Sequence, residues 1–493
     1  MQSKRDQVQA HLFLMSRLSS GMLRANPDNP ESPGGRTHRG LFMGLLCALL
    51  VCVVAALWGV ISPGQDSTWK KEGTMVMEKE TGTRYLYLDG RLRPVLNYTS
   101  ARLLAGADMK TATVKRRSTD GVAHGAPVGI AGAPDDLPGR DRLAPEPWRV
   151  CSVVHRHVSG RTTAFTRLAI AAQDTGRPLT GSQALLLAAP NGTRYLVWKG
   201  SRLKLGKGIA VAESLGYGSV TARPVSNAVI NALPAGPDLN FPEVEGRGRR
   251  GPDLAGASTR IGQVVAVQVP GSAPQYQLLL DSGLVPLTST QQALVMGDPR
   301  TRAKAYVGKD LVARAVPAEA VRDHLAPGSK RLPTAGLPDS PPQAVEVPEG
   351  TEACVVVAPS DGRGMTVSTG LLSVGVSADN VAEVPSVHVS AACTPVDLIE
   401  TRPGRGVLIR ELSSAGTQMG DTTYLVTDSG VKYPVTSAEA LGSLGFGAAD
   451  ARGLPTAVLA MLPTGPALDV TATAGGSRAA APGTRCPAGA GSN

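Results

Sequence analysis

The chain is poor in aromatic residues, which make up only 4% of its 493 residues. Proteins that bind single-stranded nucleic acid stack the bases on aromatic side chains, so this composition argues against that class. The net charge of +10 comes from 50 basic and 40 acidic residues, and no recognised nucleic-acid-binding motif accompanies them. We therefore interpret the charge as a source of solubility and of attraction to anionic envelope surfaces, and we expect no nucleic acid as a partner.

The sequence also lacks the common motifs of catalytic and nucleotide-binding sites. It contains no Gly-x-Ser-x-Gly nucleophile elbow. Its nearest approach to a phosphate-binding loop runs from Gly200 to Gly206-Lys207-Gly208, with one residue too many between the glycines and no hydroxyl to meet magnesium. We therefore assign no catalytic residue and expect no resident cofactor.

Two smaller clusters of polar residues are also best explained without chemistry. His155 and His157 fall on one face of an expected strand, but further zinc ligands are missing, so exposed histidines are the better interpretation. Asp135-Asp136 stands in a Gly/Pro loop, where turn formation is a sufficient explanation. No metal site is predicted.

One long run has no charge at all: Leu41 to Ile61, 21 residues. A helix of this length covers ~30 Å, the thickness of the hydrocarbon core of a bilayer. A buried core helix rarely runs so long without a polar residue. A signal peptide would need residues 1–40 as its n-region, and no convincing cleavage site follows Trp58. We predict one uncleaved transmembrane helix over 41–61.

The charges that flank this run predict its orientation. Six basic residues oppose three acidic ones before it, whereas Asp66, Lys70, Lys71 and Glu72 cancel after it. The positive-inside rule places residues 1–40 in the cytoplasm and the large C-terminal part outside.

The cytoplasmic part itself has helical periodicity. Over residues 4–24 the apolar residues recur every three or four positions, which predicts an amphipathic helix. Such a helix either lies on the inner membrane surface or docks on a cytoplasmic partner, and the sequence does not favour one of the two. Residues 26–38 are expected to form a flexible linker.

Beyond the span, one pattern occurs four times. Apolar strands that begin at Tyr85, Tyr195, Tyr276 and Tyr424 each lead into an Asp-Gly, Lys-Gly or Asp-Ser-Gly turn and a second strand. Glycine and aspartate tolerate the positive φ values that tight hairpins require. Short helices follow, and two of them open with the capping boxes Thr288-x-x-Gln291 and Thr436-x-x-Glu439 and end near Gly297 and Gly445.

A second pattern indicates an internal duplication of this ectodomain. The strand Arg149 to Val154 lies between the first two repeats, and Glu352 to Val357 lies between the last two; each has a cysteine at its third position. Ala232 to Pro237 after the second repeat also matches Met461 to Pro466 after the fourth. The ectodomain therefore contains the same order of elements twice: a repeat, then core strands, then a second repeat. We predict that its fold class is α+β.

The cysteines divide by compartment. Cys47 and Cys52 lie in the span, and the other four lie outside, without a CxxC spacing that would suggest a metal, so disulfides are the better interpretation. Equivalent strands of a duplicated domain usually meet around a pseudo-twofold axis, which predicts a Cys151–Cys354 bridge. Cys393 and Cys486 pair only by elimination. Two free thiols, or a bond to a partner, are the alternatives for that second pair.

The predicted domains follow from these patterns. They are the cytoplasmic helix and linker (1–40), the transmembrane helix (41–61), the first repeat (62–120), the first part of the core (121–190), the second repeat (191–242), an exposed connector with a core strand (243–271), the third repeat (272–340), the second part of the core (341–415), the fourth repeat (416–470) and a disordered tail (471–493).

The N-terminal string Ser3-Lys4-Arg5-Asp6-Gln7-Val8-Gln9-Ala10-His11 closely resembles the start of EccB, a membrane component of type VII (ESX) secretion systems. The layout of a short cytoplasmic helix, one span and a large ectodomain is also similar. Further segments match along the chain: Tyr85 to Pro94, Gly129 to Asp135, Asn191 to Leu196 and Asp421 to Pro434.

The resemblance implies an inner (plasma) membrane scaffold that assembles with the EccC motor ATPase, with EccD and EccE, and with further copies of itself. It implies an elongated extracytoplasmic domain with a central β-sheet core, four flanking repeats and a disulfide. The expected function is a structural subunit that links the motor and channel components to an extracytoplasmic assembly. The alternative is an ATP-hydrolysing subunit that uses magnesium, because family members are described so.

Overall fold

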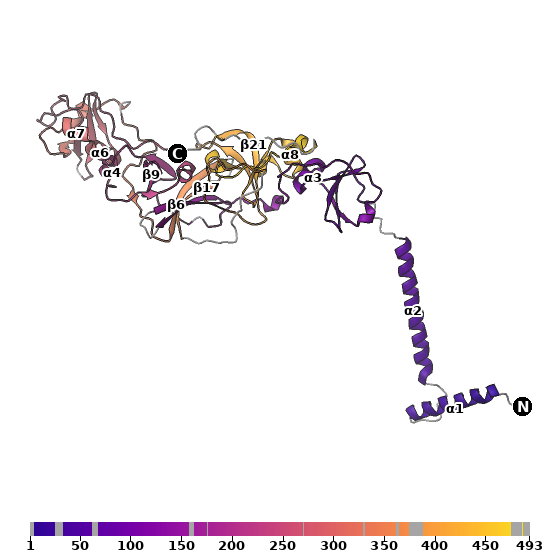
Figure 1. Cartoon of the computed structure of the whole chain (residues 1–493). Coiled ribbons are helices and arrows are strands. Elements are labelled where there is room, and N and C mark those ends of the chain that lie inside the picture. Colours follow the sequence, from indigo (N-terminus) through magenta and orange to yellow (C-terminus); the bar gives the residue numbers. More distant parts are fainter. Residues whose placement is uncertain are drawn as a thin grey trace. The chain divides into compact units, whose positions relative to one another are not determined.

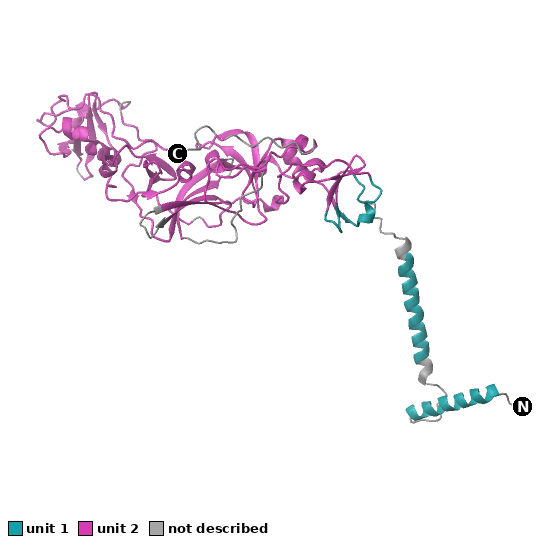
Figure 2. Ribbon diagram, in the orientation of Figure 1, with its two compact units in different colours: residues 1–71, 77–82, 112–122 teal, residues 72–76, 83–111, 123–493 magenta. Residues whose placement is uncertain are grey.

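The computed structural model describes the chain over ten segments: residues 4–24, 33–61, 68–156, 162–174, 176–269, 271–328, 331–360, 364–373, 388–474 and 486. The chain divides into two compact units (Figure 2). One combines residues 1–71, 77–82 and 112–122, and the other combines 72–76, 83–111 and 123–493.

The N-terminal part contains two helices, α1 (Lys4–Arg24) and α2 (Pro33–Ile61), both labelled in Figure 1. The amphipathic helix predicted over residues 4–24 is confirmed. Its apolar side chains are exposed; Leu12 and Met22, for example, are 62% and 82% exposed. This stripe therefore has no partner within the described chain.

The apolar run lies within α2, where Thr37–Leu57 is long and apolar enough to cross a membrane. The linker predicted over 26–38 is wrong in its second half, because α2 already begins at Pro33. A proline suits the first helical position, where its missing N–H would have no partner within the helix.

All four predicted hairpins are present. Three of them belong to four-stranded sheets, and the second belongs to a five-stranded sheet, in which the short strand β16 (Gln343–Ala344) also pairs with β8. The sheet orders are β3-β2-β1-β4, β10-β9-β8-β11, β14-β13-β12-β15 and β22-β21-β20-β23. In each sheet three consecutive strands lie side by side, a helix follows, and a fourth strand returns beside the first. We call these sheets with their helices the first to fourth repeats.

The bounds of these elements are β1 (Thr74–Glu78), β2 (Arg84–Leu88), β3 (Arg91–Pro94), α3 (Tyr98–Ala105) and β4 (Thr111–Val114); β8 (Gln183–Ala188), β9 (Arg194–Trp198), β10 (Ser201–Lys204), α4 (Ala210–Ser214) and β11 (Arg223–Pro224); β12 (Val264–Gln268), β13 (Gln275–Leu280), β14 (Gly283–Pro286), α6 (Ser289–Gly297) and β15 (Arg314–Pro317); β20 (Val407–Leu412), β21 (Gln418–Val426), β22 (Lys432–Val435), α8 (Ala438–Ser443) and β23 (Arg452–Pro455).

The turn chemistry behaves as predicted. Asp89 and Gly90 have φ values of 52° and 72°, and Lys199 and Gly200 have 47° and 72°. Positive φ at both central residues is the requirement of a type I′ hairpin turn. The strands β8, β12 and β20, however, begin before the predicted repeat boundaries at 191, 272 and 416. A short apolar strand does not reveal from its own sequence which hairpin it pairs with.

The two predicted capping boxes have different outcomes. Thr288 caps α6 with the predicted reciprocal bonds to Gln291, so that box is confirmed. The second prediction is wrong by one residue, because Ser437 caps α8 by accepting from the Ala440 N–H. The Thr436 hydroxyl instead donates to Asp469 (2.7 Å).

A six-stranded sheet in the order β19-β6-β5-β17-β18-β7 forms the centre of the ectodomain. Its strands are β5 (Trp148–Arg156), β6 (Thr162–Ala169), β7 (Arg177–Pro178), β17 (Thr351–Pro359), β18 (Met365–Ser373) and β19 (Leu398–Glu400). One face carries a large apolar core that includes Trp148, Val150 and Val355. Helices α5 (Asn227–Ala232) and α9 (Thr456–Leu459) contribute to that core and contact each other.

The register of this sheet confirms the duplication. Cys151 pairs with Arg167 on β6, and Cys354 pairs with Gly370 on β18. Both partners are shifted by the 203 residues that separate the two cysteines. Since β5 and β17 are antiparallel and Cys151 faces Cys354 directly, the pseudo-twofold axis passes between these two residues.

The repeats pack in two equivalent pairs. Helix α3 of the first repeat contacts α8 of the fourth, and α6 of the third contacts α4 of the second. Leu103 and Leu294 each lie six residues after the helix N-cap, at Asn97 and Thr288 respectively. Leu103 enters the core of the fourth repeat, and Leu294 enters the core of the second. The interfaces therefore repeat with the sequence.

The segment 243–260 is only in part the exposed connector that its glycines and charges suggested: Arg249 and Arg250 are exposed, but other residues enter the third repeat. Val244 and Leu254 are buried in the core of the third repeat. The side chain of Arg247 is also buried, and its Nη1 lies 2.6 Å from the Asp298 carboxylate, which caps α7 (Pro299–Lys304). For these residues the prediction is wrong, because pairing allows a charged side chain to be buried and composition alone does not reveal pairs.

The predicted disordered tail, 471–493, also begins too early. Residues Val470–Ala474 form helix α10, which contacts α3. Of the remainder, only Cys486 lies among the described residues.

Candidate functional site: a buried disulfide and its charge network

The structure joins Cys151 to Cys354, the pair that the sequence predicts. The two residues face each other on neighbouring antiparallel strands, and their exposed fractions are 0% and 1%. Because alternate residues of a strand share a face, Arg149 lies on the same side as Cys151, and Glu352 on the same side as Cys354. The disulfide is therefore built into the face of the sheet opposite to the apolar core.

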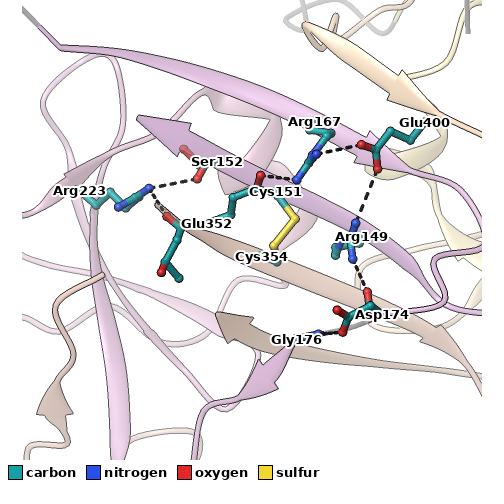
Figure 3. The surroundings of a disulfide bond; sticks show 11 residues. Arg149, Cys151, Ser152, Arg167, Asp174, Gly176, Arg223, Glu352, Cys354 and Glu400 are labelled. Carbon is teal, nitrogen blue, oxygen red and sulfur yellow. Dashed lines mark hydrogen bonds and ion pairs between the residues drawn. A yellow bond between two sulfur atoms is a disulfide. The ribbon is translucent and has the colours of Figure 1, made fainter. Parts of the chain in front are cut away.

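Buried charged residues surround the disulfide, as Figure 3 shows. The Arg167 guanidinium donates to Glu352 with Nη2 and to Glu400 with Nη1, at 2.9 Å from the latter. Arg149 pairs with the other oxygen of Glu400 at 3.6 Å and donates to the Asp174 carbonyl. Both arginines and Glu352 are more than nine-tenths buried. The network thus joins strands β5, β6, β17 and β19.

The pKa values of these groups follow from burial and pairing. Burial lowers the pKa of Arg149, and Glu400 only partly opposes this effect. For Arg167 the burial effect is outweighed by the bonds to Glu352 and Glu400, so its pKa is raised. Both guanidinium groups stay charged in any ordinary buffer. The two arginines therefore supply fixed positive charges next to the disulfide.

A cavity of about 270 Å³ lies beside this network. Its charged lining is already engaged: Arg149 with Glu400, and Arg402 with Glu146. The Asp174 carboxylate accepts from the Gly176 N–H (2.8 Å). This arrangement braces the sheet, and it presents neither a nucleophile next to a base nor a set of free metal ligands among the lining residues.

Cys151, Glu352 and Cys354 bring three metal-ligand atoms within 4.8 Å of one another. The two sulfur atoms are bonded to each other, however, and a disulfide does not supply the thiolates that a metal ion binds. Glu352 is instead held by Arg167. The group is a structural bridge with a buried ion pair.

The other positions singled out in the sequence do not join this site. Gly200 sits in a hairpin turn so close to β18 that an added Cβ would lie 1.9 Å from the Val367 carbonyl oxygen, which explains the glycine without phosphate. Asp135 accepts from Arg84 (2.5 Å) and from the Tyr98 N–H (2.8 Å), and so ties its loop to the first repeat. The side chain of His155, and all of His157, lie outside the described residues.

Sequence reasoning missed the charged partners of the disulfide. The available signal was a charge two residues before each cysteine in an otherwise apolar strand, at Arg149 and Glu352. These two residues occupy equivalent positions of the duplicated halves and carry opposite charges. Arg167 and Glu400 gave no such signal, because β6 pairs with β5, and β19 with β6, only in the folded chain.

The second disulfide joins Cys393 to Cys486. Here Cys486 is exposed and Cys393 is half-buried, in contrast to the fully buried first bridge. Thiol–disulfide exchange requires a thiolate to reach a sulfur atom. We therefore predict that a mild dithiol opens Cys393–Cys486 at a concentration that leaves Cys151–Cys354 intact. Alkylation followed by peptide mass mapping measures this order, and simultaneous reduction of the two bridges would contradict it.

A separate buried charge lies in the fourth repeat. Lys432 is only 6% exposed, and its Nζ donates to the Leu459 carbonyl at 2.6 Å. Burial lowers the pKa of Lys432 from its ordinary value of 10.5 to about 8, although Glu411 acts in the opposite direction. The folded chain thus holds this proton less tightly than the unfolded chain does.

The stability of the ectodomain should therefore rise with pH between about 8 and 10.5, by ~3 kcal/mol from this residue. Below pH 8 the lysine is charged in both states and contributes no pH dependence. Urea unfolding measured across this range, for the wild type and for Lys432→Met, tests the prediction. The two proteins should differ in the slope of stability against pH, and equal slopes would contradict a buried lysine.

The comparison that decides the family covers almost the whole chain. Residues 1–479 match the family model described as type VII secretion system ESX-1, transport TM domain B, EccB. The chain belongs to the EccB family. This membership agrees with the span in α2 and with the duplicated ectodomain behind it. Cys486, the outer partner of the second bridge, lies beyond the matched residues.

Two relatives illustrate the similarity. The ESX-3 secretion system ATPase EccB3 of Mycolicibacterium smegmatis is 27% identical over 477 residues, which cover 94% of this chain and 89% of the relative. The ESX-1 secretion system ATPase EccB1 of Mycobacterium tuberculosis is 28% identical over 477 residues, covering 94% and 92%.

Solved structures have the same fold. A chain of an intact ESX-5 inner membrane complex superposes with a TM-score of 0.66 at 24% identity, covering 99% of this chain and 98% of that chain. A chain of the EccB3 dimer from the ESX-3 core complex superposes with a TM-score of 0.65, also at 24% identity, covering 81% and 99%. The α+β fold with one N-terminal span is therefore that of the EccB family.

Proposed function

We propose that this EccB-family chain is a structural subunit of a type VII secretion membrane complex. It links a cytoplasmic EccC-type motor ATPase and the EccD and EccE membrane components to an extracytoplasmic assembly. The observation that carries the proposal is the family match over residues 1–479. The buried ion pairs that join four strands of the central sheet support it, because such a network suits a rigid support.

In this proposal each part of the chain has one task. The span in α2 anchors the chain in the inner membrane with its N-terminus in the cytoplasm, where the exposed stripe of α1 meets a partner. The ectodomain stands outside, in a compartment that permits disulfides. A reporter enzyme that is active only outside the cytoplasm, fused after Asn493, should be active, and the same fusion after Arg24 should not.

Co-purification tests the proposal directly. Affinity-tagged full-length protein, extracted from its native membranes with mild detergent, should bring down an EccC-type ATPase together with EccD-like and EccE-like proteins. A variant with Leu12→Asp and Met15→Asp should remain in the membrane but lose the ATPase. Absence of these components from the wild-type preparation would contradict the proposal.

A second candidate function follows from the names of the two relatives, which are called ATPases. In that case the ectodomain would hydrolyse ATP with magnesium outside the cytoplasm. The purified ectodomain, residues 68–493, should then release phosphate from ATP, and a single substitution should abolish the release without changing its unfolding curve. Phosphate release that survives every such substitution would identify a contaminant and contradict the activity.

A further inference from the structure

The first repeat differs from the other three at the turn that follows its fourth strand. Strand β4 ends at Val114, and Lys115-Arg116-Arg117 follows as the cap and start of a 3₁₀ helix. In the other repeats the fourth strand ends in proline, at Pro224, Pro317 and Pro455. The next three residues there are Val-Ser-Asn, Ala-Glu-Ala and Thr-Ala-Val, which carry no positive charge. The duplication thus provides three internal comparisons, and the basic turn belongs to the first repeat alone.

Lys79 adds a fourth cation at the same place. Its backbone N–H donates to the Val114 carbonyl at 2.9 Å, so the ends of β1 and β4 lie side by side. Glu80 accepts from the Arg116 N–H at 2.9 Å, and the bond to Arg116, together with the charges of Lys115 and Lys79, lowers its pKa. All four cationic side chains are exposed. We call Lys79, Lys115, Arg116 and Arg117 the basic edge.

The covalent chain keeps the basic edge close to the membrane. Only six residues separate Ile61, the end of α2, from Thr68. A segment of six residues spans at most ~20 Å when fully extended. Trp69-Lys70-Lys71-Glu72 follows at once, and the charges of Lys70 and Lys71 are offset by those of Asp66 and Glu72. The net positive charge on this side of the span therefore comes from the basic edge. The first repeat is therefore the part of the ectodomain that is tethered next to the bilayer.

From this we infer that the basic edge of the first repeat rests on anionic phospholipid headgroups of the same membrane that α2 spans. Exposed lysines and arginines near an anionic membrane surface are attracted to it over about one Debye length, ~8 Å at physiological salt. The contact would hold the repeat against the bilayer and so restrict the tilt of the ectodomain relative to the span. The inference rests on α2 being the membrane anchor and adds a lipid partner to the proposed scaffold.

Lysine reactivity in a bilayer tests this contact. Full-length protein is placed in nanodiscs of phosphatidylcholine alone, or of phosphatidylcholine mixed with an equal amount of phosphatidylglycerol. Acetylation by an amine-reactive reagent is followed by peptide mass spectrometry. Lys79 and Lys115 should react about fivefold more slowly in the anionic discs, and high salt should restore their rate. Lys309 and Lys207, exposed in the third and second repeats, are the internal references and should not change.

A charge-reversal variant separates lipid contact from other causes. Arg116→Glu with Arg117→Glu should restore the reactivity of Lys115 in anionic discs, whereas the matched control Arg322→Glu in the third repeat should not. Equal reactivity of Lys79 and Lys115 in the two kinds of disc, relative to Lys309, would overturn the inference. A chain that fails to enter discs at all would contradict the membrane anchor itself, so the two failures are distinguishable.

Discussion

Replacing Arg167 by methionine should destabilise the ectodomain by about 3–5 kcal/mol, the usual effect of removing one partner of a buried ion pair. Arg167 is 2% exposed, and its loss leaves the fully buried Glu352 carboxylate without its cation. The other arginines already have partners. Arg149 is held by Glu400 and the Asp174 carbonyl, and Arg223, whose charge also acts on Glu352, donates to the Ser152 and Thr351 carbonyls. Urea unfolding of residues 68–493, followed by circular dichroism, measures the change.

Two matched variants show whether burial is the cause. Arg249→Met removes the exposed Arg249–Asp281 pair and should change stability by at most ~1 kcal/mol. Arg167→Met combined with Glu352→Leu removes both charges, and this double variant should be clearly more stable than the single one. If Arg167→Met lost no more stability than Arg249→Met, this result would mean that water reaches the Arg167–Glu352 pair.

Removing the disulfide at the pseudo-twofold axis should have a similarly large effect. Cys151 and Cys354 lie 203 residues apart, and in the chain-entropy model a bridge of this length stabilises by ~5 kcal/mol. The double variant Cys151→Ala, Cys354→Ala should therefore unfold at a much lower urea concentration than the wild type. Both cysteine side chains are buried, so their replacement exposes no new surface to water. Hydration therefore does not offset the stability that is lost with the cross-link.

The reducing agent provides the control for this prediction. When wild type and double variant are both unfolded in excess dithiol, the cross-link is absent from both unfolded states, and the difference in stability should shrink to that of two small buried side chains. The pair Cys47→Ala, Cys52→Ala, which lies in the span, should leave the ectodomain transition unchanged. A large difference that persists under full reduction would assign the effect to packing and contradict the cross-link.

The sequence predicts the local features of this fold well because their causes are local. Asp89-Gly90 and Lys199-Gly200 specify tight turns through their tolerance of positive φ, and Thr288 with Gln291 closes its own capping box. The failures are of a different kind. Ser437 replaces Thr436 as the cap because Asp469, which is far away in the sequence, binds the Thr436 hydroxyl.

The candidate site could be predicted only in part. The duplication alone predicts that Cys151 and Cys354 meet, because equivalent strands of a duplicated domain meet at a pseudo-twofold axis. The duplication does not predict the ion pairs around these cysteines, because Arg167 contacts Glu352 and Glu400, which are 185 and 233 residues away in the sequence. The connector at 243–260 was misjudged for the same reason, since only the fold brings Arg247 to Asp298.

The sequence by itself determined the membrane span, the four hairpins, the duplication and the cysteine pair on its axis. Each of these depends on composition, short-range spacing or internal repetition, which act within a few residues or are copied along the chain. Tertiary structure decided which strands complete each repeat, which charges are buried and which are left exposed at the basic edge. Burial and ion pairing depend on contacts between residues that are far apart in the chain, and only the folded molecule brings those residues together.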